Sequence, residues 1–235
     1  MNLFYTPNIT SDEYTLNEQE SVHIHKVLRK HPGDIIHLTD GEGYFYKAEI
    51  IEADKRSCKL KILSKKEGTD KRGFKIHVAI APTKNMDRLE WFIEKTTEIG
   101  IDEISIVSCF HSERKIVKNE RLEKIKIAAC KQSLKSNFPV INELVKFKTF
   151  ISQDFKAYEK FIAYIDKDVT KGLKDLYKKE KNVLIMIGPE GDFSKEEVEE
   201  AKKQGFTPIS LGRSRLRTET AGVVACNVVH FINER

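Results

Sequence analysis

Two polar tracts near the end of the chain contain residues that could bind an anionic ligand and stabilise a charge that develops during a reaction. The first, residues 187–192, is Ile-Gly-Pro-Glu-Gly-Asp, and the second, residues 211–221, carries three arginines and the carboxylate of Glu219. Each follows a short apolar run, 183–187 or 208–211. Because ligands bind outside the carboxyl ends of strands in open parallel sheets, the tracts predict one site with guanidinium groups for an anion.

Other common motifs for nucleotide or metal binding are missing from the sequence. It contains neither GxGxxG nor GxxxxGK followed by Ser or Thr, which disfavours dinucleotide-binding and P-loop sites. Its four cysteines, Cys58, Cys109, Cys130 and Cys226, are scattered without a CxxC pair, and no HExxH is present. We therefore expect no metal site and no disulfide framework.

The second part of the chain must position the two tracts. Short apolar runs alternate there with helix-like segments. The runs are residues 74–81, 103–108, 161–165, 183–187 and 208–211. This alternation predicts an α/β fold with a parallel sheet covered by helices on both faces. Ser194 with Glu197 forms a capping box at one helix start, Gly205 fits the end of that helix, and Asp87 with Glu90 opens another helix.

The first part of the chain is mostly β. Residues 33–39, 43–53 and 57–65 have strand-like composition, whereas residues 18–30 have a helical spacing of apolar side chains. A polar segment with two glycines at 65–73 is typical of a linker. We expect two domains, 1–70 and 73–235.

The last helix, expected at 220–233, is nearly apolar around its circumference, and Gly222 and Ala225 permit close approach to it. Such a helix must be covered on more than one side. Two explanations are open: deep burial within one chain, or an isologous interface between two copies.

Positive charge is concentrated in one segment. The net charge is only +5, but residues 111–135 hold 8 basic and 3 acidic side chains. This segment could follow a phosphate backbone, or it could be a solvated helix face. No apolar run approaches the roughly 20 residues of a membrane span, and the amino terminus lacks signal-peptide features, so we expect a cytoplasmic protein that contacts no membrane.

The tracts resemble a known family. The resemblance rests on Gly188-Pro189-Glu190-Gly191, on Leu216-Arg217-Thr218-Glu219-Thr220-Ala221, and on His23-Ile24, Val27-Leu28-Arg29 and Gly33-Asp34. These match the SPOUT methyltransferases, and within them the RsmE group, which methylates N3 of a uridine in small-subunit ribosomal RNA. The resemblance implies a SPOUT-like parallel sheet with a carboxy-terminal trefoil knot, preceded by a small PUA-like β-barrel domain. It also implies a homodimer, S-adenosylmethionine as cofactor, and 16S ribosomal RNA or the small ribosomal subunit as partner.

The resemblance also assigns roles to residues. In these proteins the loops of the knot hold the cofactor largely through backbone groups. The expected cofactor-binding residues are Ile187, Gly188, Pro189, Glu190, Gly191, Leu211, Gly212, Leu216, Thr220 and Ala221. Arg217 is expected to stabilise charge on the base and Arg114 to grip phosphate or base. Either Glu219 or Glu190 is expected to accept the proton or to position a water. The expected RNA-binding residues are Lys26, Arg29, Lys30, Lys115, Arg121, Lys124 and Lys135. For Arg217, an ion pair with Glu219 is the structural alternative.

Two other functions stay open at this point. One is a SPOUT ribose 2′-O-methyltransferase acting on transfer or ribosomal RNA, and the other is a non-catalytic RNA-binding assembly factor that has lost the cofactor. The chain also departs from the family pattern at Lys131, Lys135 and Asp192. Asp192 stands where many members carry a third glycine.

Overall fold

The computed structural model describes residues 2–234, which fold into two compact units. The first unit comprises Met1–Lys71 and Ile127–Phe138, and the second comprises Arg72–Lys126 and Pro139–Arg235. The two units differ in architecture, with a mainly antiparallel sheet in the first and a parallel sheet in the second.

Residues 127–138, which the sequence placed in the second domain, belong to the first unit. The backbone N–H of Ser136 donates a 2.9 Å hydrogen bond to Asp70. The ring of Phe138 stacks on Tyr5, with ring centroids 4.8 Å apart. These contacts join residues far apart in the chain, so local sequence patterns could not reveal them.

The first unit is built on a five-stranded sheet of order β1-β3-β4-β5-β2, in which only the β1–β3 pair is parallel. The strands are β1 (Leu3–Tyr5), β2 (Glu13–Thr15), β3 (Ile35–Thr39), β4 (Tyr44–Ala53) and β5 (Cys58–Glu67). Because β5 continues to Glu67, the predicted linker starts inside a strand. Within residues 2–234, β1 and β2 are the two edge strands of this sheet and do not pair with each other. Closure into a barrel therefore stays a prediction.

The helical spacing at 18–30 forms a short α-helix that continues as a π-helix. Helix α1 (Glu18–Val22) begins after Asn17, whose side chain accepts a hydrogen bond from the N–H of Glu20, and η1 (His23–Val27) follows. Arg29 then adopts a left-handed conformation with φ 50°. The helical region therefore ends before residue 30, because a left-handed residue stops helix propagation.

The second unit is built on a six-stranded sheet of order β11-β9-β10-β6-β7-β8, and every pair in it is parallel. The strands are β6 (Ile76–Ile80), β7 (Glu103–Ser108), β8 (Val140–Lys146), β9 (Glu159–Ala163), β10 (Val183–Ile187) and β11 (Thr207–Ile209). This confirms the predicted parallel sheet. The sequence missed the outer strand β8 and placed β9 and β11 one or two residues late.

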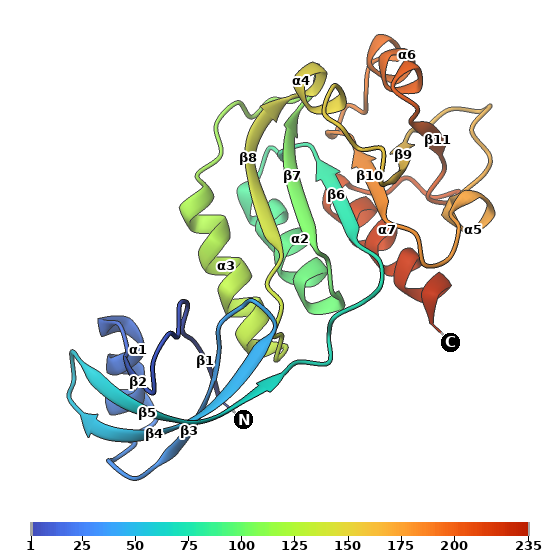
Figure 1. The fold of residues 1–235 in the computed structure, drawn as a ribbon. Helices are drawn as coiled ribbons and strands as arrows, with labels where there is room; N and C mark the ends of the chain where they lie inside the picture. The colour runs from blue at the N-terminus through green and yellow to red at the C-terminus, as the bar shows by residue number, and fades with distance from the viewer. Residues whose placement is uncertain (1, 235) are drawn as a thin grey trace. The chain divides into compact units, whose positions relative to one another are not determined.

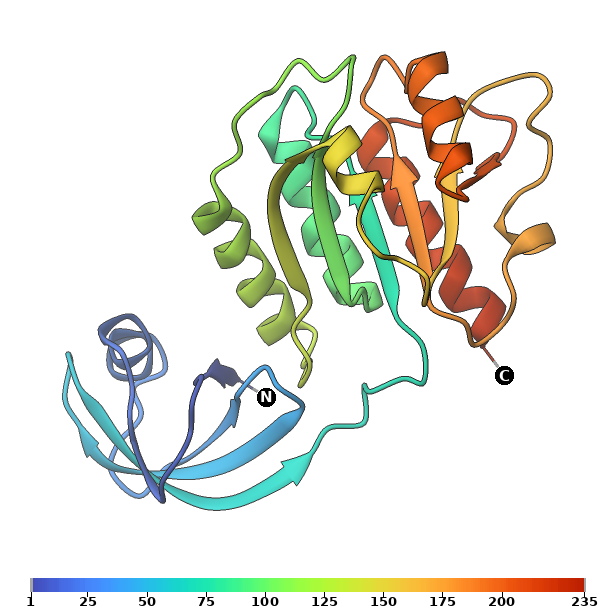
Figure 2. The ribbon, with the colours of Figure 1, turned by 45° about the horizontal axis from the view of Figure 1, so that its top comes forward.

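Helices cover both faces of this sheet (Figures 1 and 2). The helices are α2 (Met86–Ile99), α3 (Asn119–Gln132), α4 (Phe147–Ile151), α5 (Leu173–Leu176), α6 (Lys195–Lys203) and α7 (Thr218–Asn233). Alternate strand residues enter two separate cores: Val78 packs in a cluster with α2, α3, α5 and α7, and Ala79 packs in a cluster with α4 and α6. This division follows from the alternation of side chains along a strand.

Two predicted helix starts have different outcomes. Ser194 caps α6 and forms the predicted capping box with Glu197, and Gly205 follows the helix with φ 83°. The predicted box of Asp87 with Glu90 is wrong, because α2 begins two residues earlier. Its N-cap is Asn85, whose side chain accepts a hydrogen bond from the N–H of Asp87.

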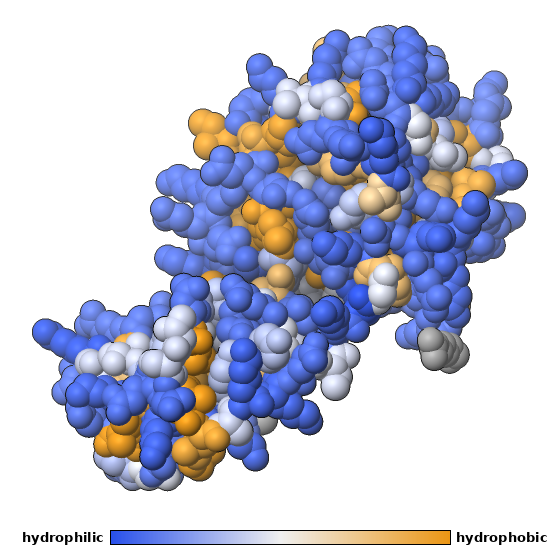
Figure 3. All heavy atoms as spheres, in the orientation of Figure 1, coloured by the Kyte–Doolittle hydropathy of each residue, from blue (hydrophilic) through white to orange (hydrophobic). Residues whose placement is uncertain are grey.

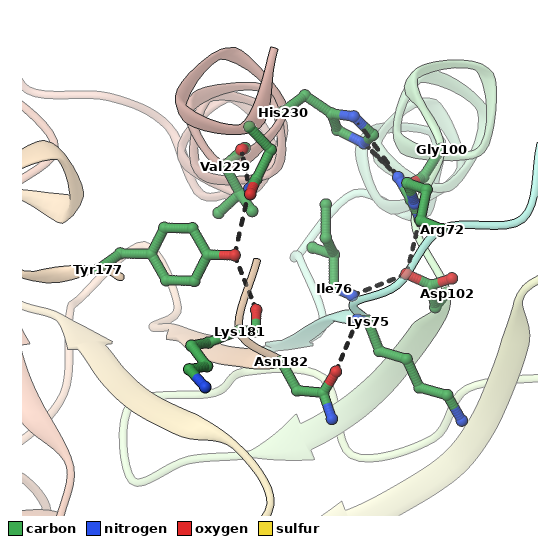
Figure 4. Close-up of polar contacts among 11 residues, drawn as sticks. Arg72, Lys75, Ile76, Gly100, Asp102, Tyr177, Lys181, Asn182, Val229 and His230 are labelled. Carbon is green, nitrogen blue, oxygen red and sulfur yellow. Dashed lines mark hydrogen bonds and ion pairs between the residues drawn. The ribbon is translucent and has the colours of Figure 1, made fainter. Parts of the chain in front are cut away.

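Helix α7 lies close against the sheet and α2. A Cβ added at Gly222 would lie 2.5 Å from the buried ring of Phe92, so a glycine is required for this approach. At the far end of α7, His230 Nε2 lies 2.9 Å from the carbonyl of Gly100 and 2.8 Å from Arg72 Nη1 (Figure 4). These contacts fix α7 at both ends.

Within residues 2–234, no helix has both the length and the apolar character to cross a membrane.

Replacing Gly222 with alanine should destabilise the protein although alanine favours helices. Overpacking against Phe92 typically costs about 1–3 kcal/mol, which should lower the melting temperature by several degrees, measured by thermal unfolding. Gly73→Ala is the matched control, because a Cβ there meets no atom within 4 Å. Equal melting temperatures for Gly222→Ala and the wild type would contradict the close packing of α7.

Candidate active site

A cavity of about 1110 Å³ lies at the carboxyl ends of β9, β10 and β11, and we call it the loop cavity. Ala163 pairs with Ile187 on one side and with Ile209 on the other, so the three strands end in register. Three loops therefore emerge side by side and line the cavity with residues 163–175, 187–192 and 209–218. This is the edge of the sheet that the sequence predicted.

Most of the residues expected at a cofactor line this cavity. They are Ile187, Gly188, Pro189, Glu190, Gly191, Leu211, Gly212, Leu216 and Ala221. Thr220 lines a neighbouring cavity instead. The loop after β9, which includes Asp166, Gly172 and Asp175, was missed by the sequence analysis. The signal for it was the predicted strand at 161–165, because parallel strands place their carboxyl ends at one edge.

Hydrogen bonds hold the three loops together. The hydroxyl of Thr218 donates to the carbonyl of Gly188 over 3.1 Å, which ties the start of α7 to the loop after β10. The N–H of Ser210 donates to the carbonyl of Lys171 over 2.9 Å. The N–H of Ile165 donates to Asp192 Oδ2 over 3.1 Å. The cavity is therefore preformed by contacts between its own walls.

The glycines of the tracts serve different geometric needs. Gly212 is left-handed, with φ 118°. Gly188 and Gly191 are not, but an added Cβ would lie 3.1 Å from the ring of Phe193 and 3.0 Å from Cβ of His111, respectively. Gly212 thus provides a positive φ, while Gly188 and Gly191 permit close approach.

Asp192 explains why this position favours glycine. Its φ is 63°, a left-handed conformation that aspartate tolerates better than most residues. Its side chain accepts hydrogen bonds from the N–H groups of Phe193 and Ile165, so it braces the loop. Burial raises the pKa of Asp192, although these two N–H groups oppose the rise.

A second cavity of about 520 Å³, the helix cavity, lies between α2 and the start of α7. It is lined by Asp87, Arg88, Trp91, Arg215, Leu216, Arg217, Glu219 and Thr220. Arg215, Leu216 and Arg217 also line the loop cavity. These three residues form a shared wall between the two cavities.

Arg217 is available for an anion. It occupies the N-cap position of α7, is exposed, and its guanidinium has no ion-pair or hydrogen-bond partner within residues 2–234. The ion pair with Glu219 that we considered is not formed. The buried carboxylate of Glu219 instead lies with Oε1 3.8 Å from Arg88 Nε, and its Oε2 has no partner among the described residues.

Arg114 is engaged with the backbone rather than open to a ligand. Its Nε and Nη2 donate to the carbonyls of Thr83 and Lys84 over 3.1 and 2.6 Å. Glu190 contacts the same loop, because its Oε1 accepts a 3.0 Å hydrogen bond from the N–H of Lys84. Both side chains therefore brace the loop between β6 and α2.

The predicted RNA-binding residues fall into paired and unpaired groups. Arg121 pairs with Asp87 and Glu90. Lys30 lies 3.9 Å from Asp34. The remaining side chains have no partner within residues 2–234, and four of them are exposed. The exposed ones are Lys26 and Arg29 in the first unit, and Lys115 and Lys124 in the second; Lys135 is half-buried.

Lys131, where the chain departs from the family pattern, has a structural role. Its Nζ lies 2.6 Å from Glu20 Oε1 within the first unit. It also lies 5.6 Å from the ring centroid of Phe4.

Within residues 2–234, no group of His, Cys, Asp and Glu side chains is arranged to hold a metal ion.

Comparison with known proteins decides the family. A family model for the RNA methyltransferase domain matches residues 70–230 of this chain. A second family model, for the RNA methyltransferase PUA domain, matches residues 16–63. A ribosomal RNA small subunit methyltransferase E of Buchnera aphidicola is 30% identical over 218 residues, which cover 90% of this chain and 85% of the relative. This chain belongs to the small subunit methyltransferase E family. A Bacillus subtilis protein of the same name is 27% identical over 236 residues, which cover 94% of this chain and 91% of the relative.

Solved structures related to this methyltransferase E family share the whole fold. A probable rRNA-methyltransferase from Porphyromonas gingivalis is 47% identical, with a TM-score of 0.92 over 99% of this chain and 98% of that one. A ribosomal RNA small subunit methyltransferase E from Neisseria gonorrhoeae, bound to S-adenosyl methionine, is 28% identical, with a TM-score of 0.86 over 99% and 98%. The α/β fold with an amino-terminal PUA-like domain is thus confirmed.

Replacing Thr218 with valine should loosen the loop cavity. The valine leaves the carbonyl of Gly188 without its donor, a loss of about 1 kcal/mol. Amide hydrogen exchange at residues 187–192 should become faster, and the melting temperature should fall by about 2–4 °C for a chain of this size. Thr218→Ser keeps the hydroxyl and is the control. Unchanged exchange in Thr218→Val would show that this bond does not hold the loops.

Proposed function

We propose that this protein is an S-adenosylmethionine-dependent methyltransferase that methylates N3 of a uridine in 16S ribosomal RNA. The observation that carries the proposal is the position of Arg217, an unpaired guanidinium in the wall of a cavity formed by three glycine-bearing loops. Family membership supports methyl transfer to small-subunit ribosomal RNA. The choice of N3 rests on the match of residues 216–221 to the uridine-specific group.

The loop cavity fits S-adenosylmethionine. Its volume suits a ligand of this size. Gly188 packs closely against Phe193, and Gly191 packs closely against His111, so neither position has space for a side chain. Backbone groups of residues 187–192 and 209–218 would hold the cofactor, with Leu211, Leu216 and Ala221 as apolar contacts. The solved structure of the Neisseria gonorrhoeae relative contains bound S-adenosyl methionine, which supports the assignment.

The chain's own residues must prepare the uracil base. When bound, S-adenosylmethionine supplies an electrophilic methyl group. N3 of uracil carries a proton near neutral pH, so its lone pair becomes nucleophilic only as that proton leaves. Arg217 donates to O2 or O4 of the base and stabilises the resulting negative charge, as preorganised donors do for developing oxyanions.

Of the two carboxylates that could accept the proton, Glu219 fits better than Glu190. Oε1 of Glu190 already accepts the N–H of Lys84. Glu219 is buried and has an oxygen without a partner among the described residues. The target base must also be unpaired or turned out of its stack, because N3 is inaccessible inside a helix.

Exposed cations support RNA binding in both units. Lys26 and Arg29 lie in the first unit, and Lys115 and Lys124 lie in the second. The visible surface is largely hydrophilic, as Figure 3 shows. We place Arg121 outside the RNA-binding set, because its guanidinium is already paired with Asp87 and Glu90.

We also propose a knotted chain and a homodimer. After the edge strand β11 the chain returns to the centre of the sheet, where α7 contacts β6 and β10, and this path supports the trefoil knot. Helix α7 carries Phe231, which is 75% exposed. An exposed aromatic on a mainly apolar helix supports an interface between two copies.

Arg217→Ala should abolish methylation while leaving the fold intact, because Arg217 contributes charge rather than packing. The measurement is mass spectrometry of nucleosides in small-subunit RNA from a deletion strain complemented with wild type, Arg217→Ala or Arg217→Lys. We expect 3-methyluridine with the wild type, none with Arg217→Ala, and a reduced amount with Arg217→Lys, which lacks the planar fork.

Other outcomes of the same measurement decide against the proposal. Wild-type amounts of 3-methyluridine with Arg217→Ala would remove Arg217 from the mechanism. Restoration of a 2′-O-methyl nucleoside instead of 3-methyluridine would identify a ribose methyltransferase. No change in any methylated nucleoside on complementation, with no S-adenosylmethionine binding in calorimetry, would identify a non-catalytic assembly factor.

Lys115→Glu with Lys124→Glu should weaken RNA binding and flatten its salt dependence. Each lost phosphate contact reduces the slope of log affinity against log salt by about 1. The control is Lys75→Glu with Lys181→Glu, two lysines that precede β6 and β10 at the amino ends of the strands. Figure 4 shows both side chains. A slope equal to that of the wild type would show that Lys115 and Lys124 contact no phosphate.

A further inference from the structure

The helix cavity has features that the cofactor does not explain. It is separated from the loop cavity by the shared wall of Arg215, Leu216 and Arg217. On its other side lie Arg88 and Trp91, which come from α2. Neither residue was expected at the site from the sequence. A cavity of about 520 Å³ that shares a wall with the cofactor site is suited to a second small group.

Trp91 offers a free aromatic face to this cavity. Its side chain is 41% exposed, although tryptophan usually buries most of its surface. Within residues 2–234 it has no aromatic partner and no hydrogen bond. Nucleobases stack readily on such faces, because every base has a π-face.

Arg88 and Glu219 form the polar side of the cavity. Glu219 is 6% exposed, and its Oε1 lies 3.8 Å from Arg88 Nε. Its Oε2 has no partner among the described residues. A buried carboxylate oxygen without a donor is costly, so it indicates that a ligand or water with a donor belongs in this cavity.

We propose that the helix cavity receives the target pyrimidine, with Trp91 stacked on the base and with Arg88 and Arg217 donating to its two carbonyl oxygens. This inference rests on the proposed function and names where its substrate binds. Uracil carries one carbonyl on each side of N3. Two guanidinium groups from different elements therefore hold both oxygens and leave N3 between them, facing the shared wall. Glu219 faces Arg88 through Oε1 and keeps Oε2 for the proton that leaves N3.

Trp91 is the sole tryptophan of the chain, so its fluorescence reports on this cavity directly. We expect uridine monophosphate, and a short single-stranded RNA containing uridine, to quench the emission of the wild-type protein. Trp91→Ala should raise KM for RNA roughly ten-fold or more, the usual effect of a lost stacking contact, and leave S-adenosylmethionine affinity in calorimetry unchanged. Trp91→Phe should keep most of the wild-type KM.

Arg88→Ala should lower kcat/KM for RNA, again without changing cofactor affinity. Lys95→Ala is the matched control on the same helix, because Lys95 pairs only with Glu94 and Glu98 in the described chain. If Trp91→Ala or Arg88→Ala fails to fold, the fluorescence titration of the wild-type protein decides. Emission that stays constant at saturating RNA would overturn the proposal.

Failure of this inference differs from failure of the proposed function. A wild-type protein that makes 3-methyluridine, combined with a wild-type KM for Trp91→Ala, would overturn the base pocket alone. A wild-type protein that makes no methylated nucleoside would overturn the function. Emission that depends on protein concentration and not on RNA would show that a second copy covers the cavity.

Discussion

The structure depends on the return of the chain from β11 at the edge of the sheet to α7 beneath its centre. Gly222 lets α7 approach Phe92, and the hydroxyl of Thr218 binds the carbonyl of Gly188. The loop after β11 is thereby held beside the loop after β10. Both cavities follow from this one connection, because residues 215–217 line each of them.

In the proposed reaction, the two cavities separate the two tasks that methyl transfer to a base requires. Backbone and glycine surfaces of the loop cavity suit a ligand that is recognised mainly by shape. The helix cavity presents three guanidinium groups, a buried carboxylate and an indole, which suit a polar, planar base. Arg217 stands in the wall between them. Proximity of two bound reactants can supply roughly 7 to 11 kcal/mol of a barrier, so this wall is central to the proposed catalysis.

The sequence could predict those features that depend on local patterns. Alternating apolar runs predicted the parallel sheet, Ser194 and Glu197 predicted the start of α6, and the two tracts predicted the edge at which the loop cavity lies. It could not predict that Arg114 braces backbone carbonyls or that Lys131 pairs with Glu20, because these partners are distant in the chain. Arg88 and Trp91 were missed for the same reason: α2 meets α7 only in the folded protein.

The central claim is that the three loops hold S-adenosylmethionine beside Arg217, and a crystal structure of the protein with that cofactor tests it most directly. We predict density for the cofactor among residues 163–175, 187–192 and 209–218, with its methyl group directed toward the wall formed by residues 215–217. A cofactor bound elsewhere, or loops that stay free at saturating concentration, would contradict the account.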